Sequence, residues 1–307
     1  MKNYKYIYGP VPSRRMGLSL GISPIPKKTC NYSCIYCQLG RTDKMTVERE
    51  DFFSLEAIKK EFIDYNKENN NYDVVTLVGE GEPTLYKSLG ELISFVKSQT
   101  NKPVALITNG ALLKEKEIWK EFKDLDIILP SLDASEQDEF RLINRPHPSI
   151  KYKDFLEGLT EFSKIFNGEI WLEIMLVKDY NDSSHSIMKF KSILSKISYD
   201  RLFVNSPVRP PAEDFVKEPD KNTLNYAVEF LEATPINLLV SEGFSSLESD
   251  DYESIINIIK RHPMNQYEIK SFLENRNCKN YSEIFKKLDN NNIEKIYYKG
   301  YNTYRIK

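Results

Sequence analysis

Histidine and cysteine are scarce in this chain of 307 residues, with three of the former and four of the latter. The histidines, His147, His185 and His262, stand apart from one another and from the cysteines, which is unlike the spacing of a zinc finger. Long apolar runs are also lacking: residues 170–177 include a glutamate and are far fewer than the roughly 20 apolar residues that cross a membrane. The sequence therefore predicts no histidine-rich metal site and no membrane span.

Residues 1–8 are polar and aromatic, so they do not resemble the apolar core of a secretory signal. Three of the four cysteines are clustered and cannot pair off among themselves, which is unlike the disulfide framework of a small secreted protein. We therefore expect a reducing, cytoplasmic location. With 40% hydrophobic residues, a chain of this length can bury one large α/β core and a small additional domain.

The clustered cysteines, Cys30, Cys34 and Cys37, have the spacing Cys-x3-Cys-x2-Cys and supply three thiolates to one metal centre. Structural zinc takes four ligands in a closed tetrahedron, and the remaining cysteine, Cys278, lies far downstream. An iron–sulfur cluster held by only three thiolates leaves one iron free to bind a small molecule. The triad therefore favours a reactive iron–sulfur centre over structural zinc, and Cys278 is interpreted as a small apolar residue of a core.

Short β-branched runs alternate with longer amphipathic stretches from residue 50 onward, a pattern typical of βαβ units and a parallel sheet. Ser54 is suited to cap the first helix. The predicted strands are residues 18–22, 73–78, 104–108, 127–132, 170–177 and 202–205, and the predicted helices are residues 55–63, 89–98, 114–122, 152–165 and 186–195. Six such units are too few to close an eight-stranded barrel, so the periodicity alone leaves open a doubly wound sheet and a partial barrel.

Polar residues follow several predicted strands, at the edge where parallel α/β sheets place their ligands. They are Gly79-Glu-Gly-Glu-Pro-Thr84, Thr108-Asn-Gly110 and Ser131-Leu-Asp133. The glycines of the first segment allow the backbone to approach a ligand closely, although a glycine-rich turn is also an ordinary connection. Likewise, Asn-Gly is a common turn and a serine after a strand often caps a helix. Glu173 interrupts an apolar run, so its carboxylate either finds a partner inside the sheet or faces solvent.

Two proline-stiffened segments carry arginines outside the helix and strand pattern. Arg14 and Arg15 lie within residues 9–17, and Arg209 lies within residues 205–213. Rigid guanidinium groups suit the bidentate binding of a carboxylate or a phosphate. Each segment taken alone is better interpreted as a proline-rich surface connection.

Residues 260–307 differ in character from the rest of the chain. A helix is predicted at 262–273, a second at 281–288, and two strands at 293–306 that turn at Lys299-Gly300, which is a winged-helix pattern. This segment holds 11 Lys plus Arg against 5 Asp plus Glu, whereas the remainder holds 32 against 40. Its basic composition indicates a domain that binds nucleic acid or an acidic peptide, with a docking or dimerisation domain as the alternative.

The cysteine triad, with Tyr36 directly before its last cysteine, resembles the signature of the radical SAM enzymes. The resemblance implies an α/β fold with a partial (β/α)6 barrel, which we place at residues 1–235. The local pattern described above then places the winged-helix-like domain at 260–307, with a connecting segment at 236–259. The resemblance also implies that the three cysteines hold a [4Fe–4S] cluster whose open iron binds S-adenosylmethionine. A reducing partner such as ferredoxin or flavodoxin would supply the electron that cleaves this cofactor to a 5′-deoxyadenosyl radical, which abstracts hydrogen from the substrate.

The same resemblance implies which residues contact the cofactor. Residues 79–84 are similar to the Gly-Gly-Glu-Pro motif of the family, which receives the methionyl ammonium group; Glu82 stands at the motif glutamate and Glu80 replaces its first glycine. Tyr36 is expected to lie against the adenine. The implied cofactor-binding residues are Tyr36, Gly79, Gly81, Glu82, Asn109, Ser131, Glu173 and Asn205.

Taken together with the arginine-bearing segments, the cysteine loop resembles a narrower group over residues 4–215, which contains the archaeal wyosine tRNA-base synthases and many iron–sulfur oxidoreductases. Arg14, Arg15 and Arg209 are then candidate substrate-binding residues. The implied substrate is a macromolecule, with a tRNA base first and a peptide or protein as the alternative. A redox-sensing regulator that binds nucleic acid is the other class, but it needs no S-adenosylmethionine pocket. We expect the C-terminal segment to recruit the substrate while the barrel starts the radical chemistry.

Overall fold

A curved eight-stranded sheet forms the centre of the computed structural model, which describes residues 4–236, 243–278 and 280–307. Its strand order is β1-β2-β5-β6-β7-β8-β9-β10, and neighbouring strands are parallel except for β1 and β2. The strands are β1 (Ile7–Ser13), β2 (Gly17–Ile22), β5 (Val74–Leu77), β6 (Val104–Thr108), β7 (Ile127–Pro130), β8 (Glu169–Met175), β9 (Arg201–Asn205) and β10 (Thr234–Pro235). Because β1 and β10 remain edges in the described residues, the barrel is open.

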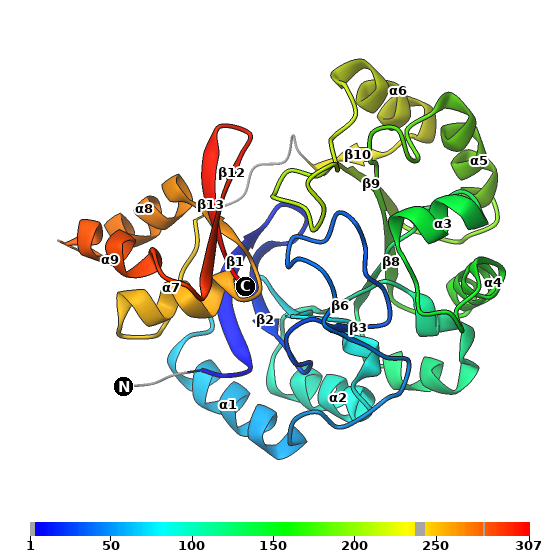
Figure 1. Ribbon diagram of the computed structural model, residues 1–307. Coiled ribbons are helices and arrows are strands. Elements are labelled where there is room, and N and C mark those ends of the chain that lie inside the picture. Colours follow the sequence, from blue (N-terminus) through cyan, green and yellow to red (C-terminus); the bar gives the residue numbers. More distant parts are fainter. Residues whose placement is uncertain (1–3, 237–242, 279) are drawn as a thin grey trace.

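Helices cover the outer face of the sheet, and the loop that carries the cysteines crosses its inner side (Figure 1). The helices of this part are α1 (Leu55–Glu68), α2 (Leu89–Gln99), α3 (Gln137–Ile143), α4 (Tyr152–Ser163), α5 (Ser184–Leu194) and α6 (Lys221–Leu231). Ser54 caps α1, as predicted, by accepting a hydrogen bond from the backbone of Ala57. No helix within the described ranges is long and apolar enough to cross a membrane.

Successive side chains along each strand point to opposite faces of the sheet, so the strands contribute to an outer core and to an inner one. Val75 and Leu77 of β5 point outward into the main core beneath the helices, whereas Val74 packs into a smaller inner cluster with Trp171 and Phe203. Further along β5, the hydroxyls of Thr76 and Ser19 share a hydrogen bond of 2.6 Å on the inner side. The inner face thus changes from apolar to polar toward the carboxyl ends of the strands.

The C-terminal part packs against β1. It comprises α7 (Asp251–Ile259), β11 (Met264–Asn265), α8 (Gln266–Asn275), α9 (Tyr281–Leu288), β12 (Ile293–Tyr298) and β13 (Tyr301–Ile306), with the strands in the antiparallel order β11-β13-β12. Helix α7 lies within the segment that we interpreted as a connection. The apolar cluster of this part includes Tyr8 and Val11 of β1, and Cys278 packs against it as predicted.

Three local predictions differ from the structure. Strand β1 was missed because Pro10 and Pro12 argue against a strand, but both are tolerated at an edge. The predicted helix at 114–122 is instead two 3-10 turns, η2 (Ala111–Lys114) and η3 (Lys116–Phe122), where the Leu113 carbonyl accepts the Trp119 indole N–H at 2.8 Å. The helix predicted from residue 262 begins at Gln266, because Asn265 forms a capping box and pairs with β13.

The close approach of α4 to the first 3-10 turn generates a stability prediction. A Cβ atom at Gly158 of α4 would lie 2.5 Å from the backbone nitrogen of Lys114. Gly158→Ala should therefore lower the free energy of unfolding by about 1–3 kcal/mol, even though alanine gains about 1 kcal/mol in helix propensity. Urea denaturation measures the difference. Gly243→Ala is the control, since among the described residues the nearest atom to a Cβ at that position, Asn275 Nδ2, is 3.5 Å away; equal stabilities of the two variants would contradict the prediction.

Candidate active site

The three clustered cysteines lie on a loop that begins at β3 (Thr29–Cys30) and returns at β4 (Lys44–Met45). The loop has little regular structure of its own and is held by its neighbours. The Ile35 N–H donates to the Ile143 carbonyl at 2.9 Å on one side, and the Thr46 N–H donates to the Cys30 carbonyl at 3.1 Å at its base. The positions of the thiols are therefore set by contacts with the surrounding barrel.

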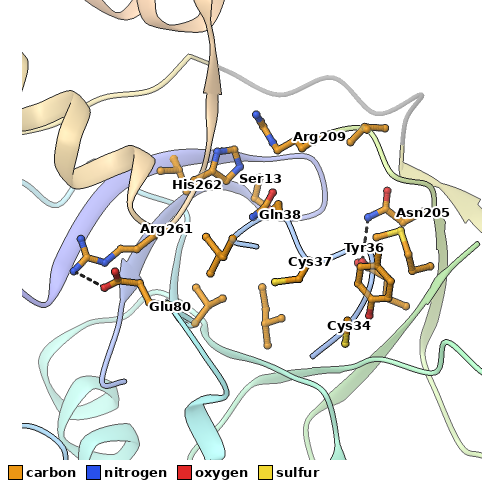
Figure 2. A pocket seen from close by; sticks show the side chains of 18 of the residues that line it. Ser13, Cys34, Tyr36, Cys37, Gln38, Glu80, Asn205, Arg209, Arg261 and His262 are labelled. Atoms are coloured by element: carbon orange, nitrogen blue, oxygen red, sulfur yellow. Dashed lines mark hydrogen bonds and ion pairs between the residues drawn. The ribbon is translucent and has the colours of Figure 1, made fainter. Parts of the chain in front are cut away.

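A cavity of about 430 Å³ opens beside this loop, at the carboxyl ends of the strands (Figure 2). Most of the predicted site residues line it: Cys30, Cys34, Cys37, Tyr36, Gly79, Gly81, Glu173, Asn205, Arg14, Arg15 and Arg209. Its floor is the apolar inner cluster, through Met16, Ile107 and Ile236. Glu82, Asn109 and Ser131 are not among the lining residues.

The thiols provide a donor set that fits an iron–sulfur cluster. Burial raises the pKa of Cys34 well above its usual range and also raises the pKa values of Cys30 and Cys37. Asn144 Nδ2 lies 3.6 Å from Cys34 Sγ, and the Tyr32 N–H donates to Cys30 Sγ at 3.4 Å, so amide groups are positioned to stabilise charge on sulfur. In the described part of the chain, no three His, Cys, Asp or Glu side chains could hold a single metal ion.

Asp133 connects Tyr36 to the cysteine loop. The Tyr36 hydroxyl donates to Asp133 Oδ2, Asn144 donates to the same oxygen at 2.9 Å, and the Met175 N–H donates to Asp133 Oδ1 at 3.0 Å. Asp133 is 4% exposed, and its burial raises its pKa. Ser131 is the predicted cofactor contact at this strand end, yet it pairs through its backbone with Glu173, and Asp133 makes the contact with a cavity side chain.

Glu82 is not among the lining residues and joins the glycine-rich segment to the end of β6. Its carboxylate accepts hydrogen bonds from the Thr84 N–H and hydroxyl, from the Thr108 hydroxyl and from the Asn109 N–H, at 2.6–3.1 Å. Burial raises the pKa of Glu82, and these donors act in the opposite direction. Asn109 in turn donates to Asn31 Oδ1 of the cysteine loop at 2.5 Å. Both residues thus support the loop in this structure.

Gly79 and Gly81 are required by packing. A Cβ atom at Gly79 would lie 2.2 Å from Ser23 Oγ, and one at Gly81 would lie 1.8 Å from the Thr29 carbonyl oxygen. The same carbonyl accepts the Glu82 N–H at 3.1 Å. The glycine-rich segment therefore lies directly on the strand that carries Cys30.

Glu173 has partners inside the cavity, so the interpretation of this carboxylate as solvent-facing does not apply. Arg15 Nη1 forms an ion pair with Glu173 Oε2, and Asn205 Nδ2 donates to Glu173 Oε1 at 3.1 Å. Burial lowers the pKa of Arg15 to about 10, which still leaves the guanidinium charged near neutral pH. Arg15 comes from the turn before β2, Glu173 from β8 and Asn205 from β9, and the structure brings them together as one polar group.

The C-terminal part contributes cavity residues that no sequence pattern indicated. Arg261 Nη2 lies 3.4 Å from Glu80 Oε2, and Arg209 contacts Glu268 at 3.1 Å; all four residues, together with His262, line the cavity. Figure 2 shows the Arg261–Glu80 pair on one side of the cavity wall. The sequence shows Glu80 as an acid in place of the first glycine of the motif. A buried acid needs a cationic partner, but the sequence does not indicate which residue supplies it.

Arg305 of β13 links the C-terminal part to the cysteine loop. Its guanidinium donates to the Gln38 carbonyl at 3.4 Å and to the Pro211 carbonyl at 3.1 Å, and it pairs with Glu294 at 2.7 Å. Gln38 directly follows Cys37. The positive charge of Arg305 acts to lower the pKa of Cys37, against the larger effect of burial.

The family model described as "Radical SAM superfamily" matches residues 25–190, so the chain belongs to the radical SAM superfamily. It is 33% identical to UPF0026 protein MJ1312 of Methanocaldococcus jannaschii over 301 residues, which cover 95% of this chain and 93% of that protein; both chains therefore belong to one family. It is also 37% identical over 290 residues to a Brachyspira hyodysenteriae protein named GTPase Obg. This match covers 92% of the present chain but spans only 42% of that relative.

Solved structures share the fold at low sequence identity. A radical SAM methyltransferase from Sphaerobacter thermophilus has a TM-score of 0.56 and 15% identity, over 72% of this chain and 67% of that one. The structure of TYW1 with a lysine-pyruvate adduct has a TM-score of 0.51 and 19% identity, over 70% and 72%. These likenesses confirm the α/β fold with a mostly parallel sheet. Family membership confirms that the chain is an enzyme whose cofactors are a [4Fe–4S] cluster and S-adenosylmethionine.

The first site prediction concerns the cluster ligands. Cys34→Ala should lose most of the iron and sulfide that the wild-type chain retains after anaerobic reconstitution, because one of three thiolate ligands is removed. Cys278→Ala should retain both, since Cys278 packs against the second apolar cluster. Iron and sulfide are counted per chain after gel filtration. A full complement in Cys34→Ala, or its loss in Cys278→Ala, would show that the assignment is wrong.

The second site prediction follows from the contact between Gly81 and Thr29. Gly81→Ala would force the Thr29 carbonyl to move, and with it the adjacent Cys30. We expect reduced cluster retention and a free energy of unfolding lower by about 1–3 kcal/mol, measured by iron analysis and urea denaturation. Gly243→Ala should match wild type in both. Wild-type cluster content and stability in Gly81→Ala would contradict the packing argument.

Proposed function

We propose that this chain is a radical SAM enzyme that acts on RNA, with a tRNA base as the substrate. When bound, the cluster and S-adenosylmethionine supply a 5′-deoxyadenosyl radical that abstracts a hydrogen atom from the substrate. Cys30, Cys34 and Cys37 would hold the cluster, and a partner such as ferredoxin or flavodoxin would deliver the electron. Membership of the wyosine-synthase-like group is part of this proposal, supported by the fold shared with TYW1.

The chain's own residues would orient the cofactor and substrate and exclude water. Asp133 holds the Tyr36 hydroxyl, so the ring is fixed against the cavity where the adenine is expected. The ion pair between Arg15 and Glu173, with Asn205 beside it, presents polar groups to the ribose or the substrate. The apolar floor through Ile107 and Ile236 limits the entry of water from below.

The observation that carries the RNA proposal is the surface of the C-terminal part. Its excess of basic residues is accompanied by exposed tyrosines, which can stack on unpaired bases. The exposed fractions are 74% for Tyr297, 60% for Tyr267, 44% for Tyr301 and 40% for Tyr281. Basic side chains combined with exposed aromatic rings are typical of proteins that bind single-stranded RNA.

The order of elements supports the assignment of a winged-helix domain. A helix, a short strand, two further helices and a hairpin follow one another from α7 to β13. The hairpin is fixed to the barrel: the Tyr298 hydroxyl donates to the Pro207 carbonyl at 2.7 Å, and Lys299 pairs with Glu218. Tyr297 is left exposed beside this anchor. RNA held there would be adjacent to segment 205–213, of which residues 205–209 line the cavity.

A peptide or protein substrate is the second candidate, because a basic surface can also bind an acidic peptide. The interpretation as a redox-sensing regulator is not supported by membership of an enzyme superfamily. The exposed tyrosines favour RNA over an acidic peptide, which would need only the lysines.

The test is a salt titration of tRNA binding to the full-length chain. Affinity should fall steeply with added salt. Tyr297→Ala should weaken binding by about 1–3 kcal/mol without changing the salt dependence. Lys286→Gln combined with Lys287→Gln should instead reduce the slope of log K against log salt by about one for each phosphate that the lysines no longer neutralise. Tyr226→Ala is the control, since this 42% exposed tyrosine lies on α6 of the barrel.

No tRNA binding by the full-length chain at low salt would remove the RNA proposal and leave the peptide or protein candidate. Equal reductions in affinity in Tyr297→Ala and Tyr226→Ala would show that the C-terminal surface is not the binding site.

A further inference from the structure

The cavity is lined by more cationic side chains than carboxylates. Its three lining carboxylates are each paired with an arginine, in the pairs Glu80–Arg261, Glu173–Arg15 and Glu268–Arg209. Among the described residues, the two further lining cations, Arg14 and Lys28, have no ion-pair partner. The cavity wall therefore carries uncompensated positive charge, which favours an anionic ligand.

The unpaired Arg14 lines the same cavity as Arg209. It occupies the turn between β1 and β2, and burial together with the charge of Arg209 lowers its pKa, with Glu268 acting in the opposite direction. Arg209 is fixed from the other side: Nη1 and Nη2 contact the two carboxylate oxygens of Glu268 at 3.2 and 3.1 Å, and Nη1 also donates to the Pro263 carbonyl. Arg14 therefore has no carboxylate of its own, because Glu268, the acid that acts on its pKa, is already paired with Arg209.

His262 also lines the cavity, and one of its ring nitrogens lacks a hydrogen-bond partner among the described residues. This nitrogen, Nδ1, is buried. Phe244 packs against the ring edge to face, with the ring centroids 5.2 Å apart. Burial, with the charges of Arg209 and Arg14, lowers the pKa of His262 well below its usual value, so the imidazole is neutral. A buried nitrogen without a partner is costly, and a ligand that hydrogen-bonds to it removes that cost.

We propose that Arg14, Arg209 and His262 form an anion subsite of the cavity that binds a phosphate group of the substrate. Figure 2 shows His262 and Arg209 on one side of the cavity, with Cys34 and Tyr36 across from them. A phosphate held there leaves the attached sugar and base extending toward the cysteine loop. The proposal rests on the proposed function, because a nucleotide supplies the phosphate, and it adds the C-terminal His262 to the substrate-binding residues.

The arrangement suits a phosphate better than a carboxylate. A carboxylate is planar and matches one guanidinium bidentately, and Glu268 already occupies that face of Arg209. Arg14, Arg209 and His262 come from three separate segments, before β2, after β9 and before β11. Donors that converge from three segments can each meet a different oxygen of a tetrahedral anion.

Calorimetric titration of the full-length, cluster-loaded chain tests the subsite without tRNA and without turnover. The probes are inorganic phosphate, uridine 5′-monophosphate, uridine and acetate. Both phosphates should bind saturably, and uridine and acetate at least about tenfold more weakly, since a charge-assisted hydrogen bond contributes about 1.5–3 kcal/mol. Arg14→Gln and His262→Gln should each weaken phosphate binding about tenfold or more. Arg201→Gln, an equal loss of charge on the exposed end of β9, should leave it unchanged.

Three results would overturn the subsite: no saturable phosphate binding to the wild-type chain, acetate binding as tight as phosphate, or unchanged phosphate affinity in folded Arg14→Gln. Circular dichroism verifies the fold of each variant. Arg14→Gln is the variant whose fold should be disturbed least, because Arg14 lies at an exposed turn. Phosphate binding without tRNA binding would support the subsite and reject the RNA proposal, so the two failures are distinguishable.

Discussion

The contact between Gly81 and the Thr29 carbonyl is the constraint on which the candidate site depends. The cysteine loop has only the two short strands β3 and β4 of its own, so its position is fixed by the neighbours on which it lies. The glycine-rich segment supplies that support on one side, through the Glu82 N–H and through the Glu80 carbonyl, which accepts the Lys28 N–H at 2.5 Å. Glu82 then ties the same segment to the end of β6. The sheet, the glycines and the thiols therefore form one continuous set of contacts.

Charge pairing joins the C-terminal part to the barrel. Glu80 pairs with Arg261, and the apolar cluster behind this pair contains Tyr8 and Val11 of β1 together with residues of α7 and α8. Removing residues from 260 onward would leave Glu80 without its cation and expose that cluster to water. The expected division, with initiation in the barrel and recruitment in the C-terminal segment, is therefore better examined with surface substitutions such as Tyr297→Ala than with a truncation.

Local features of the sequence predicted much of the fold. The strands at 104–108 and 202–205 and the cap at Ser54 follow from β-branched runs and local hydrogen bonding, and they agree with the structure. The glycine-rich segment lies at the cavity, as its place after a strand indicated, and the cysteines and the arginines line the same cavity. The contributions of Asp133, Arg261 and His262 could not be predicted, because they depend on which distant segments meet, and no local pattern specifies a partner far along the chain.

The contacts of Arg305 with the cysteine loop can form only after the C-terminal hairpin has been synthesised. During translation the three clustered cysteines emerge from the ribosome long before β12 and β13 are synthesised. In that interval the carbonyls of Gln38 and Pro211 have no Arg305 guanidinium to accept a hydrogen bond from. The loop therefore reaches its final set of contacts only after the hairpin has emerged and packed. Iron–sulfur assembly on the nascent chain would meet a looser loop than assembly on the released protein, which makes the timing of cluster insertion a property of the fold.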